Sequence, residues 1–79
     1  MAQRRETMHI GRLIRQQMEQ QGKTTSWLAR ELAYCRTNVY KIYDKKSIDT
    51  DLLLRISRLL HYDFFAAYSQ EIEKSVADK

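Results

Sequence analysis

The spacing of apolar residues between Thr25 and Asp44 constrains the fold of this chain more than any other feature. Leu28 and Leu32 lie four residues apart, which places them on one face of a helix. Val39 and Ile42 lie three residues apart and also share a face. The pattern predicts two short helices that cross at a steep angle. The expected break is Ala33–Cys35, and the expected buried set is Leu28, Ala29, Leu32, Tyr34, Val39 and Ile42.

The polar residues of the second predicted helix have the chemistry of a nucleic-acid contact. Their side chains can reach both base edges and phosphates. They are Arg36, Thr37, Asn38, Tyr40 and Lys41.

The same stretch resembles the helix-turn-helix of the Cro/CI-type (XRE-like) DNA-binding domains. The matching positions are Leu28, Ala29, Leu32, Tyr34, Val39 and Ile42. Ala33 departs from the pattern, because the family usually has Gly at this turn position, where φ is positive and Ala costs about 1 kcal/mol. Cys35 also departs, since a Ser or Thr N-cap is usual there. Tyr43, Asp44 and Lys45 replace the acidic residue and Asn-Gly that often follow.

The resemblance covers roughly residues 8–68 and implies an all-α fold, a five-helix lambda-repressor-like bundle. Residues 1–7 would then be a flexible N-terminal arm, and residues 69–79 a C-terminal tail that could be helical. Such domains usually bind pseudo-palindromic DNA as dimers.

Composition agrees with a small helical protein. The 79 residues suffice for one domain with a modest core and no large catalytic cleft. No proline and only two glycines favour helices, and a single cysteine excludes an internal disulfide. The sequence shows no signal peptide or transmembrane run, so we expect a cytoplasmic protein.

No enzyme or cofactor site is indicated. No Ser/His/Asp constellation, phosphate loop or paired-carboxylate pocket can be assembled. His9 and His61 are too far apart, with too few neighbouring ligands, for a zinc site. We therefore expect no catalytic activity, cofactor, metal or membrane association.

The positive charge is concentrated in the middle of the chain. Residues 23–46 carry six Lys or Arg and two acidic residues, whereas residues 47–79 carry four and six. Phosphate binding requires a basic surface centred on the contact region. The overall sequence pI of about 9.4 is a weaker indication of nucleic-acid binding than this local charge, because many proteins that bind no nucleic acid have a similar pI.

Periodicity and capping residues predict five helices. The first begins at Met8 or His9, with Thr7 as its N-cap, and stops near Gly22. The next two are residues 25–32, capped by Thr24, and residues 36–43 or 36–44. A fourth starts at Asp49 or Thr50 and ends at His61; a fifth, capped by Asp63, starts at Phe64.

Helix geometry and the resemblance assign roles to the polar residues. Arg36 and Thr37 would read bases, with Arg36 bidentate to guanine, and Lys41 would be a third base or phosphate contact. Asn38 and Tyr40 flank that face as phosphate contacts, and Asn38 could instead read adenine. Thr25 would present its backbone N–H to a phosphate. Lys23, Lys45 and Lys46 would be backbone anchors. The ordinary alternative for each is a solvated surface residue.

Three further features each have two interpretations. Phe65, Tyr68, Ile72 and Val76 could form a homodimer interface, or the tail could be a frayed terminus. Trp27 could mark a partner surface, or be a partly buried ring that covers the first helix or the N-terminal arm. Cys35 could sense oxidation at the positive end of a helix, or simply be a small capping residue.

The sequence therefore predicts a sequence-specific double-stranded DNA-binding protein, a small repressor-like transcriptional regulator that acts by occupying a promoter. The alternative is a protein-interaction module that keeps the fold without specific DNA binding. The eight aromatic residues favour the alternative slightly, and the basic middle third favours DNA binding more.

Overall fold

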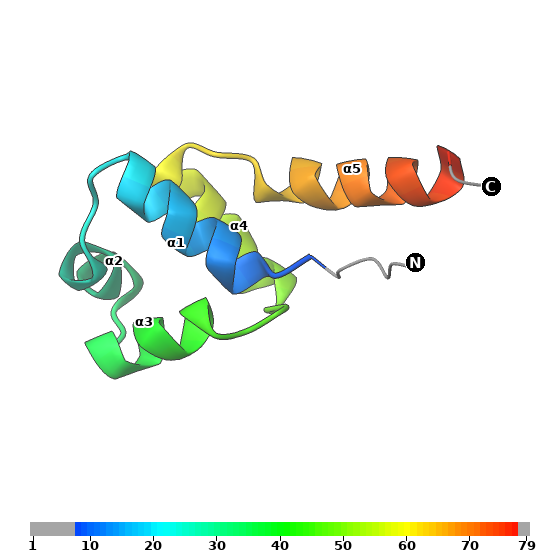
Figure 1. The fold of residues 1–79 in the computed structure, drawn as a ribbon. Helices are drawn as coiled ribbons and strands as arrows, with labels where there is room; N and C mark the ends of the chain where they lie inside the picture. Colours follow the sequence, from blue (N-terminus) through cyan, green and yellow to red (C-terminus); the bar gives the residue numbers. More distant parts are fainter. Residues whose placement is uncertain (1–7, 78–79) are drawn as a thin grey trace.

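The computed structural model describes the backbone of residues 8–77 and the side chains up to Glu73. The described chain is all-α, as predicted. Its helices are α1 (Ile10–Gln20), α2 (Thr25–Leu32), α3 (Arg36–Tyr43), α4 (Thr50–Leu60) and α5 (Phe64–Ala77). Figure 1 shows α1 to α4 gathered into a bundle and α5 extending away from it.

The buried side chains follow the predicted helical spacing. Each of the first four helices contributes residues three or four apart, and Phe64 closes the core from α5. The core consists of Ile10, Ile14, Met18, Leu28, Ala29, Leu32, Val39, Ile42, Tyr43, Leu53, Ile56, Leu60 and Phe64. Tyr34, which we expected to be buried, is only partly buried. Its ring is half-buried, because it lies at the rim of the core in the turn between α2 and α3.

The side-chain caps of α2 and α5, Thr24 and Asp63, are those expected, and Asp49 caps α4, whose first residue is Thr50. Thr24 Oγ1 accepts a hydrogen bond from the Trp27 N–H at 3.0 Å. Asp49 Oδ1 accepts from Leu52 at 2.7 Å, and Asp63 Oδ1 from Ala66 at 3.1 Å. These side chains satisfy N–H groups that a helix start leaves without a partner.

The cap predicted for α1 is wrong. His9, not Thr7, is the N-cap, and its Nδ1 accepts from the Arg12 N–H at 3.2 Å; Thr7 itself lies outside the described residues. The N–H groups of Ile10 and Gly11 donate to the carbonyls of Lys46 and Lys45, at 3.0 and 2.9 Å. These two long-range bonds set where α1 begins, and the sequence near residue 9 carries no sign of them.

Three helices end in the same way, at a residue in the left-handed conformation. Gly22, Ala33 and His61 have φ values of 70°, 59° and 53°. After each of them the next N–H bonds to a carbonyl five residues earlier in the helix. The pairs are Lys23 to Met18 (2.9 Å), Tyr34 to Ala29 (2.9 Å) and Tyr62 to Ser57 (3.1 Å). The stop at Gly22 and the positive φ at Ala33 are both confirmed.

The C-terminal tail continues α5 rather than forming a separate element. The helix runs without a break through residue 68, where we expected the domain to end. Phe65 and Tyr68 are half-buried against the core, whereas Ile72 is 63% exposed. In Figure 1 the second half of α5 extends away from the bundle, in keeping with the exposure of Ile72.

Candidate nucleic-acid interface

The turn at residues 33–35 sets the direction of α3. Ala33 adopts φ 59° and ψ 38°, which reverses the chain just after α2. Ala29, 5% exposed, lies in the core where a larger side chain would push the neighbouring helices apart. Figure 1 looks almost along the axis of α2 while α3 lies near the plane of the picture, so the two helices cross steeply.

A close approach of α1 fixes the other end of α3. A Cβ atom on Gly11 would overlap the carbonyl oxygens of Ile42 and Tyr43. The position therefore requires glycine for space. The Tyr43 hydroxyl also hydrogen-bonds Thr25 Oγ1 at 3.1 Å, which joins α3 to the first turn of α2. Contacts with both α1 and α2 therefore fix the orientation of α3 in the bundle.

The two faces of α3 differ sharply. Val39, Ile42 and Tyr43 are buried. Every base or phosphate contact predicted on this helix is exposed and lies on the remaining surface: Arg36, Thr37, Asn38, Tyr40 and Lys41. The structure thus gathers these five residues on one outward surface. Any amphipathic surface helix shows such a division, so it is the identity of the exposed residues that carries information.

Arg36 lies at the junction between α2 and α3. Its Nη1 is 3.5 Å from Ser26 Oγ, at the limit of a hydrogen bond. Because this contact is long and exposed, it holds the guanidinium only weakly. Arg36 can therefore turn toward a guanine or a phosphate at little cost.

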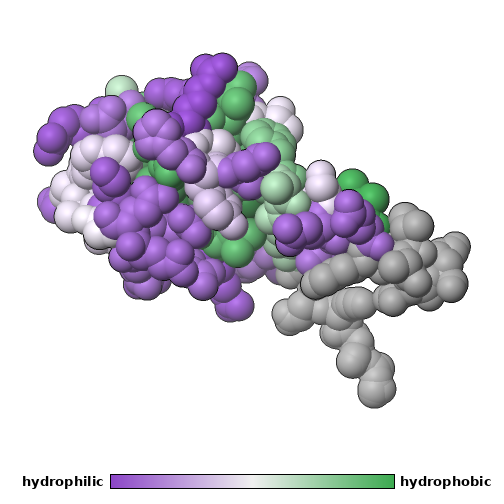
Figure 2. Space-filling view, turned by 90° about the horizontal axis from the view of Figure 1, so that it is seen from above, coloured by the Kyte–Doolittle hydropathy of each residue, from purple (hydrophilic) through white to green (hydrophobic). Residues whose placement is uncertain are grey.

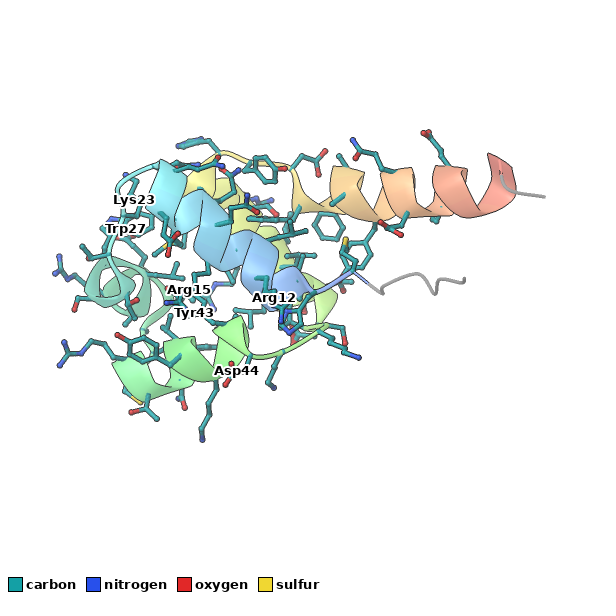
Figure 3. All side chains as sticks on the ribbon, viewed as in Figure 1. Arg12, Arg15, Lys23, Trp27, Tyr43 and Asp44 are labelled. Atoms are coloured by element: carbon teal, nitrogen blue, oxygen red, sulfur yellow. The ribbon has the colours of Figure 1, made fainter. Side chains whose placement is uncertain are left out.

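A second cluster forms at the N-terminal end of α2. Lys23, Thr25 and Tyr40, which we predicted separately, line one hollow of about 170 Å³ together with Arg15, Met18, Glu19 and Tyr43. Tyr40 is 56% exposed and its ring meets Tyr43 edge-on at 5.9 Å. The Lys23 ammonium stands 4.7 Å from the centre of the Trp27 ring. Figure 3 shows Lys23 beside Trp27 at one end of α1.

Arg15 is the residue of this cluster that the sequence did not reveal. Its guanidinium lies 5.8 Å from the centre of the Tyr43 ring, and its Nε is 3.6 Å from Glu19 Oε2. Figure 3 shows Arg15 and Tyr43 together between α1 and α3. On the sequence, Arg15 is one of several polar residues on the outer face of a helix, and only the packing of α1 on α3 brings it here.

The two lysines after α3 point to different parts of the surface. Their carbonyls both hold the start of α1. The side chain of Lys45 lines a groove with Asn38 and Lys41. Lys46 instead borders a hollow beside α5, lined also by Met8, Ser47, Tyr68 and Glu71. The structure therefore brings Lys45, and not Lys46, to the side of the predicted base contacts.

Cys35 and Trp27 occupy positions close to those expected. Cys35 is a free, exposed thiol at the N-cap of α3, and its side chain makes no capping hydrogen bond. Trp27 is half-buried and packs against the core. The ring is therefore half-buried as expected, and its role as a partner surface stays a prediction.

Metal and membrane features were sought in the same part of the chain. Among the described residues, no three His, Cys, Asp or Glu side chains lie close enough together to hold a metal ion. None of the helices within residues 8–77 is both long and apolar enough to cross a bilayer.

Comparison with known proteins adds no relative. No protein-family model, no curated protein and no solved structure matches this chain.

Proposed function

We propose that this chain is a sequence-specific double-stranded DNA-binding protein that inserts α3 into the major groove and acts as a small, repressor-like transcriptional regulator. The observation that supports this most is the outward surface of α3. Five residues that can bond to bases or phosphates are exposed there, while the opposite face is buried. A helix held in this way can enter a groove without rearrangement, so little ordering entropy is lost on binding.

The base contacts are Arg36, Thr37 and Lys41. Arg36 begins α3, and the first residues of a recognition helix point toward base edges. Its planar guanidinium can donate two hydrogen bonds to guanine O6 and N7. Thr37 offers a hydroxyl or a methyl group, and Lys41 lies one turn further along the same surface.

The proposed phosphate contacts lie on both sides of this helix. At the start of α2, backbone N–H groups and the positive end of the helix favour an anion, and Lys23, Tyr40 and Arg15 surround that position. On the other side, Asn38 and Lys45 lie along the groove next to α3. These contacts position the protein on the duplex and carry no sequence information.

We also propose that the protein binds DNA as a homodimer through α5. One recognition helix buries too little surface for tight and selective binding. Ile72 is the most exposed of the large hydrophobic residues on the described surface, and Phe65 and Tyr68 lie on the same helix. Figure 2 shows hydrophobic atoms where α5 leaves a mainly hydrophilic bundle. The side chain of Val76, the fourth residue of this predicted interface, lies outside the described residues.

A gel shift with random-sequence duplex tests DNA binding directly. With about four phosphate contacts per protomer, and so about eight in the proposed dimer, affinity should fall roughly 10⁴-fold between 50 and 200 mM salt. Lys23→Ala should weaken binding to all sequences alike and should lower the slope of log affinity against log salt concentration by about 2, one for each protomer. Absence of binding at low salt would instead support the protein-interaction module.

A further inference from the structure

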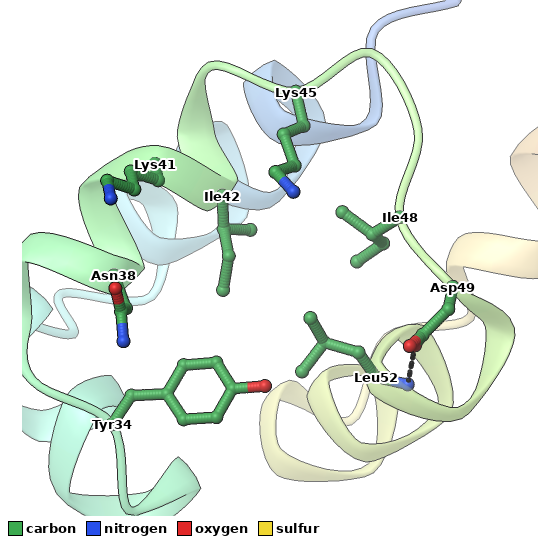
Figure 4. Close-up of a pocket in the computed structure, with 8 residues that line it drawn as sticks. All are labelled: Tyr34, Asn38, Lys41, Ile42, Lys45, Ile48, Asp49 and Leu52. Atoms are coloured by element: carbon green, nitrogen blue, oxygen red, sulfur yellow. Dashed lines mark hydrogen bonds between the residues drawn. The ribbon is translucent and has the colours of Figure 1, made fainter.

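The groove beside α3, whose edge holds the proposed phosphate contacts Asn38 and Lys45, also has an apolar interior that DNA would not fill. It lies between the α2–α3 turn, α3, the connection after it and the first turn of α4. Its volume is about 350 Å³, and it is lined by Tyr34, Asn38, Lys41, Ile42, Lys45, Ile48, Asp49 and Leu52. Figure 4 shows these residues around a common space. The volume is at the lower end of the range of about 300–1,000 Å³ usual for small-molecule sites.

The inner part of the groove is apolar. Ile42 is 4% exposed, while Ile48 and Leu52 are half-buried and face the space from the other side. The half-buried ring of Tyr34 closes one end. Three aliphatic side chains and an aromatic ring form a surface that suits a flat or branched hydrocarbon body.

The rim of the groove is positively charged. Lys41 and Lys45 are exposed, and Figure 4 shows the Lys45 side chain reaching into the space between Ile42 and Ile48. Asp49 is the one acidic residue of the lining, and its Oδ1 already accepts the Leu52 N–H at 2.7 Å. The Tyr34 hydroxyl and the Asn38 amide add neutral hydrogen-bond donors. The two lysines outweigh the single carboxylate, so the rim carries a net positive charge that favours an anion.

We infer that this groove binds a small amphipathic carboxylate with an aromatic or branched apolar body. The carboxylate accepts hydrogen bonds from the Lys45 ammonium and the Tyr34 hydroxyl, and the apolar body covers Ile48 and Leu52. Two ammonium groups near an apolar floor favour such a molecule over a purely inorganic anion, which cannot fill the inner part.

The ligand also acts as an effector, and this part rests on the proposed function. Asn38 and Lys41 belong both to the groove and to the outward surface of α3. A bound carboxylate engages or neutralises cations that would otherwise meet DNA. Ligand and DNA therefore exclude each other, and each lowers the affinity for the other.

The binding site is tested without DNA by titrating the full chain with 1-naphthoate and following amide NMR shifts. We expect saturable shifts confined to residues around the groove, with a Kd of about 0.1–1 mM for a ligand of this size. Neutral 1-naphthylmethanol should bind at least about fivefold more weakly, and inorganic phosphate should cause no saturable shift at the same positions. Equal binding of the alcohol, or shifts that lie elsewhere, would overturn the assignment.

Two lysines supply a matched pair of variants. Lys45→Gln should weaken naphthoate binding about tenfold, because a charge-assisted bond is lost. Lys46→Gln removes the same charge one residue further on, outside the groove, and should change Kd less than twofold. Tyr34→Phe should weaken binding about threefold to fivefold and leaves the predicted DNA contacts intact. If both lysine variants behave alike, the groove does not recognise the carboxylate.

The competition is measured by duplex binding at 10 mM naphthoate against 10 mM sodium chloride. We expect the apparent Kd for DNA to rise at least about fivefold with naphthoate and to stay constant with chloride, which controls for screening. An unchanged Kd for DNA with naphthoate bound would refute the effector role. A protein that binds naphthoate but no DNA would refute the proposed function and leave the groove site standing.

Discussion

At the scale of single residues, two positions in α2, α3 and their turn stand out because they lack the residue best suited to them. Ala33 has φ 59°, where glycine avoids a steric cost of about 1 kcal/mol. Cys35 caps α3 without a side-chain hydrogen bond. Both were identified from the sequence, because turn and cap positions depend on local chemistry that a resemblance can align.

Ala33→Gly should raise the free energy of unfolding by about 1 kcal/mol, since it relieves the left-handed strain. Thermal denaturation should show this as an increase in Tm of roughly 4–8 °C. The control is Ala66→Gly in the exposed first turn of α5, which should lower stability by about 0.5–1 kcal/mol. If the two substitutions destabilise equally, the conformation assigned to Ala33 is wrong.

Cys35→Ser should stabilise the protein by about 0.5–1 kcal/mol, because a serine hydroxyl is a better acceptor for the N–H groups at the start of α3. Urea denaturation measures this change in the free energy of unfolding, provided that its dependence on urea concentration (the m-value) is the same for both proteins. The same variant tests oxidation: if peroxide weakens DNA binding of the original chain but not of Cys35→Ser, the thiol is responsible. An unchanged affinity of the oxidised original chain removes the redox hypothesis.

At the scale of helices, the decisive contact is the one between α1 and α3. Gly11 provides the room, and the first two N–H groups of α1 bond to carbonyls that follow α3. The extents of α2 and α3 could be predicted, because apolar spacing, Thr24 and Ala33 are all local signals. The close packing of α1 against α3 could not be predicted, because nothing in the sequence around Gly11 distinguishes it from any other glycine inside a helix. The place of Arg15 in the cluster could not be predicted either, because it also depends on the packing of α1 against α3.

Gly11→Ala should destabilise the protein by about 1–3 kcal/mol, although alanine is normally the better helix former, because the added Cβ forces α1 away from α3. Arg12→Ala, at the exposed next position, should change stability by less than about 0.5 kcal/mol. Urea denaturation compares the two. A Gly11→Ala protein as stable as the original would show that α1 and α3 are further apart than described.

At the scale of the whole molecule, the bundle presents α3 on one side and extends α5 on another. The sequence indicated that the tail could be helical but left two interpretations for its apolar residues, a homodimer interface or a frayed terminus. A single sequence does not show what covers an exposed apolar residue. Ile72 is 63% exposed while Phe65 and Tyr68 are half-buried, so Ile72 is the residue whose substitution tests the proposed interface.

Ile72→Glu should convert a dimer into a monomer, since it places a charge in an apolar contact. Light scattering should give about twice the chain mass of 9.5 kDa for the original protein and the single mass for the variant. Gln70→Glu adds the same charge at another exposed position of α5 and should remain dimeric. An original chain that is monomeric at every concentration would rule out the homodimer.

Sequence-specific recognition through α3 is the central claim, and selection from a random duplex pool tests it most directly. The original chain should enrich one motif that contains a guanine at a fixed position. Arg36→Ala should lose the preference at that position, worth roughly 10- to 100-fold, and keep the rest. Lys23→Ala should enrich the same motif with lower affinity. The claim is contradicted if the original chain enriches no motif, or if Arg36→Ala enriches an identical one.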